Sequence, residues 1–192
     1  MDDEREVSVS RRPRADVERN RNRLLAAAKT AFADKGSAAS LDEIARAAGL
    51  GIGTLYRHFP TREALIEAVY RQESEALYAA ATRLAETRPP IEALREWLLL
   101  FVDYMAVKRG MMETLRAMVA GGSVLKANSG ARLTEAVETL VGRGTASGDL
   151  RLDTAPLALL HALAGVGNMS AGSQDEARRL VDILIAGMRA KG

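Results

Sequence analysis

Cysteine is absent from this sequence, and histidine occurs only twice, at His58 and His161. Without thiols the chain cannot form disulfides, thiolate metal sites, iron–sulfur clusters or a cysteine nucleophile. Two imidazoles are too few for a multi-histidine metal site within one chain. We therefore expect no metal and no cofactor, and a chain without cysteine fits the reducing cytoplasm.

The sequence also lacks a long apolar run and a strong net charge. No stretch of about 18 apolar residues is present, which excludes a membrane span, and the acidic start has the wrong charge for a signal peptide. The formal net charge is only +2, so charge alone does not identify a polyanion partner. The basic charge is local, because residues 8–35 hold eight Lys or Arg against three acidic residues.

What the chain has is helical periodicity. Residues 1–18 lack apolar spacing and are expected to form a flexible arm, whose Arg11, Arg12 and Arg14 either reach DNA or are simply solvated. Amphipathic spacing predicts a first helix over residues 19–35, ended by Gly36. The later expected helices span 41–48, 52–59, 61–88, 91–108, 111–120, 124–143, 155–167 and 174–190. No segment alternates as a strand does, so the fold class is all-α, with about nine helices.

The second and third helices are joined by a short glycine turn. Ser40 and Glu43 have the spacing of a capping box, and Gly49-Leu50-Gly51 gives the outline of a helix-turn-helix. Leu55 and Phe59 lie four residues apart and are expected to pack inward. The opposite face, with polar groups that reach phosphates and glycines that permit close approach, suits a DNA groove.

The stretch Ser40–Leu65 resembles the DNA-binding signature of the TetR family, the tetracycline-repressor-like transcription regulators. The resemblance implies a three-helix DNA-binding domain over 19–70, with the recognition helix at 52–58. It also implies a helical domain over 71–192 that binds an effector and forms a homodimer. The palindromic operator is then double-stranded DNA, with half-sites about one helical turn apart.

The resemblance also implies roles for eight residues. Those expected to face bases are Ile52, Gly53, Thr54 and Arg57, and those expected on phosphates are Ser40, Tyr56, His58 and Arg62. The chemistry agrees, because a guanidinium pairs with guanine and an isoleucine contacts the thymine methyl group. The sequence departs from the family pattern twice: Gly51 replaces a hydroxyl residue, and Arg62 replaces the commoner lysine.

Candidate effector-pocket residues share soft or aromatic side chains, and they are Trp97, Phe101, Tyr104, Met105, Met118 and His161. Helix-spaced apolar residues are more often core, and His161 is more readily a core or interface histidine than a ligand. The last two helices are the expected subunit interface, since Leu159, Leu163, Leu180, Leu184 and Met188 carry much apolar surface.

Three functions remain open from the sequence. The first is a repressor released from its operator by a small-molecule effector of unknown identity. The second is a DNA-binding regulator that responds to a protein partner. The third is a helical small-molecule-binding enzyme with a vestigial DNA-binding domain, but no catalytic constellation stands out, so we expect no enzyme.

Overall fold

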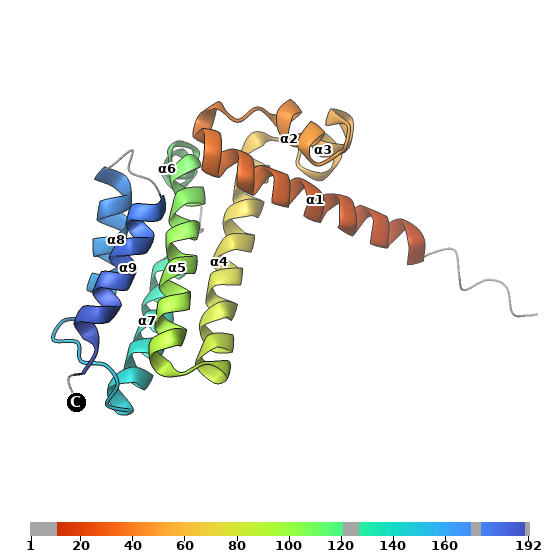
Figure 1. The fold of residues 1–192 in the computed structure, drawn as a ribbon. Helices are drawn as coiled ribbons and strands as arrows, with labels where there is room; N and C mark the ends of the chain where they lie inside the picture. The colour runs from red at the N-terminus through yellow and green to blue at the C-terminus, as the bar shows by residue number, and fades with distance from the viewer. Residues whose placement is uncertain (1–10, 121–126, 170–173, 191–192) are drawn as a thin grey trace, which may run out of the picture.

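The computed structural model describes residues 11–120, 127–169 and 174–190. Within these residues the chain forms nine α-helices and one short 3-10 turn, with no strand, which confirms the expected all-α fold. Figure 1 shows α1 to α3 gathered at one end of the molecule, above a bundle of the remaining helices. None of the described helices has the length and apolarity of a membrane span.

The N-terminal end comprises α1 (Arg11–Lys35), the 3-10 turn η1 (Gly36–Ala38), α2 (Leu41–Ala47) and α3 (Ile52–His58). The apolar stripe predicted for α1 faces inward, with Leu24 and Phe32 fully buried. These side chains join Ile44 of α2 and Leu55 of α3 in one hydrophobic core. Burial of this shared core therefore holds two seven-residue helices that are too short to be stable alone.

The bundle comprises α4 (Arg62–Thr87), α5 (Pro90–Gly110), α6 (Met112–Ala120), α7 (Ala127–Ala146), α8 (Leu157–Met169) and α9 (Gln174–Met188). Helix α5 is central and packs against α1, α4, α7, α8 and α9. Two ion pairs tie it to α9, Arg95–Asp182 at 2.6 Å and Arg178–Asp103 at 2.9 Å. The end of α9 is fixed by backbone bonds to the loop before α8, including Arg151 N to Met188 O at 2.7 Å.

The prediction of a flexible arm is wrong for residues 11–18, because α1 begins at Arg11. Arginine, alanine and glutamate propagate a helix well, and Pro13 is tolerated in a first turn. Asp16 and Arg19 add an ion pair three residues apart. This part of α1 is solvated, with Val17 55% exposed, so its sequence shows no apolar stripe. Residues 1–10 lie outside the described residues.

Helix α4 runs unbroken through the domain boundary predicted at residue 70. Its first turns bury Leu65 and Ile66, and its later turns bury Leu77 and Leu84. One continuous helix therefore contributes buried side chains both near the helix-turn-helix and in the bundle.

Candidate nucleic-acid interface

Helix α2 begins with the capping box predicted from the sequence. Glu43 N donates to Ser40 Oγ at 3.1 Å, and Ser40 N donates to Glu43 Oε2 at 3.4 Å. Lys35 donates to Glu43 Oε1 at 3.2 Å, and this bond, followed by that from Ser40, lowers the pKa of the Glu43 carboxyl. The hydroxyl of Ser40 accepts within the cap, so its own proton is left to donate outward.

The turn between α2 and α3 depends on glycine at one position. Gly49 has φ +64°, a conformation that side chains rarely adopt. Leu50 N donates to Ala45 O at 2.9 Å, and the Leu50 side chain packs partly buried against the core, as predicted. On the other side, Arg23 of α1 donates to Gly49 O at 3.5 Å. The turn is therefore held from both sides.

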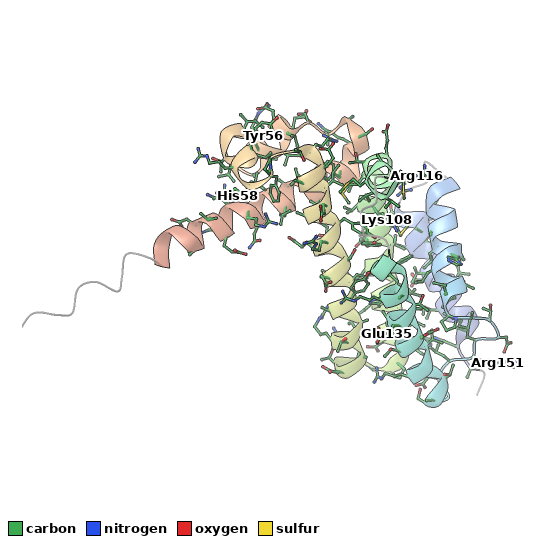
Figure 2. All side chains as sticks on the ribbon, turned by 180° about the vertical axis from the view of Figure 1, so that it is seen from behind. Tyr56, His58, Lys108, Arg116, Glu135 and Arg151 are labelled. Atoms are coloured by element: carbon green, nitrogen blue, oxygen red, sulfur yellow. The ribbon has the colours of Figure 1, made fainter. Side chains whose placement is uncertain are left out.

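Helix α3 has one buried face and one open face. Leu55 is fully buried and Phe59, just after the helix, is 2% exposed, which confirms the predicted inward face. Tyr56 is 49% exposed and Ile52 is 37% exposed, and Gly53 and Arg57 are exposed with them. Figure 2 shows Tyr56 on the outer side of this unit. Aromatic and apolar side chains are thus presented outward beside an arginine.

The start of α3 has no side-chain cap, since Gly51 occupies the N-cap position. The absence of a Cβ at Gly51 and Gly53 leaves open space, and a methyl group added at either would meet nothing within 4 Å. Because neither residue has a side chain, the backbone at the start of α3 can approach a partner surface closely. Thr54 is half-buried at its edge.

His58 turns toward α1 rather than fully outward. It is half-buried and lines a crevice of about 540 Å³ between α1 and α4, together with Arg21 and Glu67. Figure 2 shows it nearer α1 than Tyr56 is. The guanidinium of Arg21 lies 4.6 Å from the centre of the neighbouring Phe59 ring. His58 therefore lies at the edge of the open face and not at its centre.

Arg62 is the predicted phosphate residue that the structure places elsewhere. Its guanidinium donates to the backbone carbonyls of Ala39 and Ser37, the second at 3.0 Å. It also lies 5.3 Å from the centre of the Phe32 ring. Two N–H donors of Arg62 are thus engaged by backbone carbonyls of the protein itself.

Sequence reasoning missed Arg21 and Arg23, which lie two residues apart on α1 and support Phe59 and Gly49. Their charge was visible as part of the basic segment 8–35. The residues that they contact could not be predicted, because these contacts depend on how α1 packs against the helix-turn-helix in the folded protein.

Three of the predicted effector residues come together on one face of α5. The rings of Trp97 and Phe101 are 6.0 Å apart, and those of Phe101 and Tyr104 are 6.2 Å apart. Trp97 is fully buried and donates Nε1–H to Leu77 O at 2.9 Å. Burial raises the pKa of Tyr104, so its phenol stays neutral, and Ser74 Oγ donates to it at 3.5 Å. This cluster joins α5 to α4 as core.

The other three predicted effector residues are more exposed to solvent than this cluster. Met105 and Met118 are half-buried. His161 is exposed on α8, so the expectation of a core histidine is wrong for the single chain, and that of an interface histidine stays a prediction. A crevice of about 300 Å³ opens instead between α4 and α7, and none of the six predicted residues lines it. Arg132 lies there 3.9 Å from the centre of the Tyr78 ring.

The leucines predicted to form the subunit interface are only partly available. Leu159, Leu163 and Met188 are buried within the chain itself, because α8 and α9 pack on α5 through them. Leu180 and Leu184 are half-buried. Helix α9 instead exposes a large apolar residue that was not predicted, Ile183, which is 67% exposed.

Comparison with known families identifies both ends of the chain. Residues 24–69 match the family model of bacterial regulatory proteins of the tetR family. Residues 89–190 match the C-terminal domain of SbtR-like transcriptional regulators. The chain belongs to the TetR family.

Solved structures of TetR-family proteins match it over nearly its whole length. A TetR transcriptional regulator from Streptomyces coelicolor is 42% identical, with a TM-score of 0.78, and the match covers 90% of this chain and 99% of that one. A TetR regulatory protein from Mycobacterium vanbaalenii is 31% identical, with a TM-score of 0.70, covering 93% and 99% of the two chains.

Curated relatives match less than half of this TetR-family chain. The transcriptional regulator UidR of Escherichia coli is 37% identical over 91 residues, which is 47% of this chain and 41% of UidR. The repressor LfrR of Mycolicibacterium smegmatis is 40% identical over 76 residues, 40% of each chain. The chain thus spans less than half the length of the curated relatives that it matches.

Proposed function

We propose that this TetR-family protein is a sequence-specific DNA-binding transcriptional regulator, a dimeric repressor that releases its operator when a small molecule binds the α4–α9 bundle. The observation that supports this most directly is the open face of α3. Ile52, Gly53, Tyr56 and Arg57 point away from a core that holds the helix rigidly by Leu55 and Phe59. Family membership and the names of UidR and LfrR support the same reading.

The proposed interface residues have two different roles. Arg57 pairs with guanine and Ile52 contacts a thymine methyl group in the major groove, while Gly53 and Thr54 lie against base edges. Tyr56, Ser40 and His58 donate to phosphates, which fixes register without reading sequence. The DNA-reading unit is residues 19–70, and the remainder carries effector binding and dimerisation. Such a regulator acts in the cytoplasm, where its operator lies.

Selection of bound duplexes from random DNA tests this function. The expected product is a palindrome whose half-sites lie about one helical turn apart or slightly more. Binding to the selected duplex should weaken as the salt concentration rises. The reason is that binding releases counterions from the DNA, and this release is less favourable in concentrated salt. Failure to enrich any sequence, or binding that does not respond to salt, would overturn the proposal.

Release of DNA by an effector is tested on the same duplex. Candidate small molecules are added to the complex, and an effector should release the DNA while binding the protein in calorimetry. An extract that releases the DNA only through its protein fraction would favour the alternative regulator that responds to a protein partner. An enzyme with a vestigial DNA-binding domain would bind small molecules but would show no salt-dependent, sequence-selective binding to DNA.

A further inference from the structure

The guanidinium of Arg62 joins three segments at the base of the helix-turn-helix. Arg62 is the first residue of α4 and is half-buried. Its Nη1 donates to Ala39 O, and its Nη2 donates to Ser37 O at 3.0 Å. Its guanidinium carbon lies over the ring of Phe32, near the end of α1, 5.3 Å from the ring centre. One side chain therefore contacts α1, η1 and the residue before the cap of α2.

The two carbonyls that accept from Arg62 belong to Ser37 and Ala39. These residues come just before Ser40, the N-cap of α2. Ala39 is 1% exposed, so this end of the connection is buried beside the core. A hydrogen bond from a charged donor is stronger than one between neutral groups. The path of the chain into α2 is thus fixed from α4, and α3 follows because α2 and α3 pack as one unit.

We propose that Arg62 is a positioning residue, which sets the orientation of the α2–α3 unit on α4 and does not contact phosphate. The inference rests on the proposed function, since orientation matters only if α3 enters a groove. Within a dimer, a small rotation of this unit displaces the two recognition helices relative to successive major grooves.

Replacing Arg62 by lysine distinguishes a positioning role from a phosphate contact. A lysine ammonium presents its three donors from one atom, so it cannot reproduce the fixed two-nitrogen fork of the guanidinium, and it has no planar face to lie on Phe32. As a phosphate ligand, however, a lysine serves well as a point charge. Arg62→Lys therefore keeps the charge and loses the positioning contacts, whereas Arg62→Gln loses both.

The test measures the affinity of both variants for the duplex selected with the wild-type protein, over a range of salt concentrations. Arg71→Lys and Arg71→Gln are matched controls, because Arg71 is an exposed arginine on the same helix that pairs only locally, with Glu67 at 2.6 Å. We expect Arg62→Lys to weaken binding by about tenfold, with the slope of log affinity against log salt unchanged. The Arg71 variants should bind within about twofold of wild type.

Two results would overturn the proposal. Arg62→Lys could bind as wild type while Arg62→Gln reduces the salt slope by about one for each protomer, which is the signature of a lost phosphate contact. Alternatively, both variants could bind as wild type, in which case Arg62 positions nothing. If Arg62→Gln does not fold, the affinity and slope of Arg62→Lys still decide.

Hydrogen exchange separates this inference from the proposed function. In Arg62→Lys the amides of residues 40–45 should exchange faster than in wild type, and those of α9 should be unchanged. The measurement needs no DNA, so it stands even if no duplex is selected. Exchange at 40–45 identical to wild type would contradict the positioning role.

Discussion

At the scale of single residues, Tyr56 and Arg57 are neighbours on α3 and are both exposed, yet they are proposed to do different things. A guanidinium offers paired donors that match guanine, so its loss removes sequence information. A phenol that donates to phosphate contributes affinity but carries no sequence information.

Arg57→Ala and Tyr56→Phe should therefore differ in kind. Arg57→Ala should cost about 1–3 kcal/mol on the selected duplex and relax the preference at one base pair of each half-site. Tyr56→Phe should weaken binding to all duplexes by a similar factor. Competition binding with single-base-pair substitutions measures both. Unchanged base preference in Arg57→Ala would remove Arg57 from direct base readout.

At the scale of elements, α5 reaches the N-terminal end through a contact between backbones. Gly110, the last residue of α5, lies so close to α1 that an added Cβ would be 1.8 Å from the Phe32 carbonyl oxygen. The same added Cβ would lie 3.2 Å from the Cα of Gly36, which has φ +57°. No side chain at residue 110 is compatible with this approach, so the joint between α1 and α5 depends on glycine.

Gly110→Ala should destabilise the protein by about 1–3 kcal/mol, because the backbones of α1 and α5 must separate. Gly142→Ala is the control, since an added Cβ on that helical residue of α7 meets nothing within 4 Å. It should stabilise the protein by about 0.5–1 kcal/mol through helix propensity. Urea unfolding gives both values. Equal stability of the two variants would contradict the tight joint.

The start of α2 should respond to acid. The pKa of Glu43 is lowered from the ordinary value of 4.5, first by its bond to Lys35. Its ionised form therefore adds stability above the unfolded pKa, and this is lost as pH falls through the folded pKa. Glu43→Gln should lack this part of the pH dependence. Urea midpoints between about pH 3 and pH 6 test it, and parallel curves for the two proteins would contradict it.

The elements that the sequence predicted well are those whose own residues determine them. The capping box of α2 and the inward pair Leu55 and Phe59 follow from local spacing, and the structure confirms them. The contacts of Arg62 and Gly110 could not be predicted, because both join segments that are distant along the chain. The early start of α1 was missed because a solvated helix has no apolar stripe.

At the scale of the whole molecule, the outer side of α9 is the surface on which dimerisation should depend. Ile183 is 67% exposed. On the same helix the half-buried Leu180 lies three residues before it, and the half-buried Leu184 lies one residue after it. A charge introduced in the middle of an apolar interface is costly because it is desolvated without a partner.

Ile183→Glu should convert a dimer into a monomer at micromolar concentration without loss of helix content, as sedimentation and circular dichroism would show. Val17→Glu is the matched control, since Val17 is also an exposed apolar residue, 55% exposed, but lies on α1. It should remain dimeric. A wild-type protein that sediments as a monomer would contradict the dimeric repressor altogether.

The most direct test of DNA recognition through the open face of α3 is the affinity of the Tyr56→Ala, Arg57→Ala double variant for the selected duplex. Both residues are exposed and lie outside the core, so folding and dimerisation should be unchanged. We expect sequence-selective binding to be abolished, while helix content and sedimentation match wild type. Wild-type affinity in the double variant would contradict it.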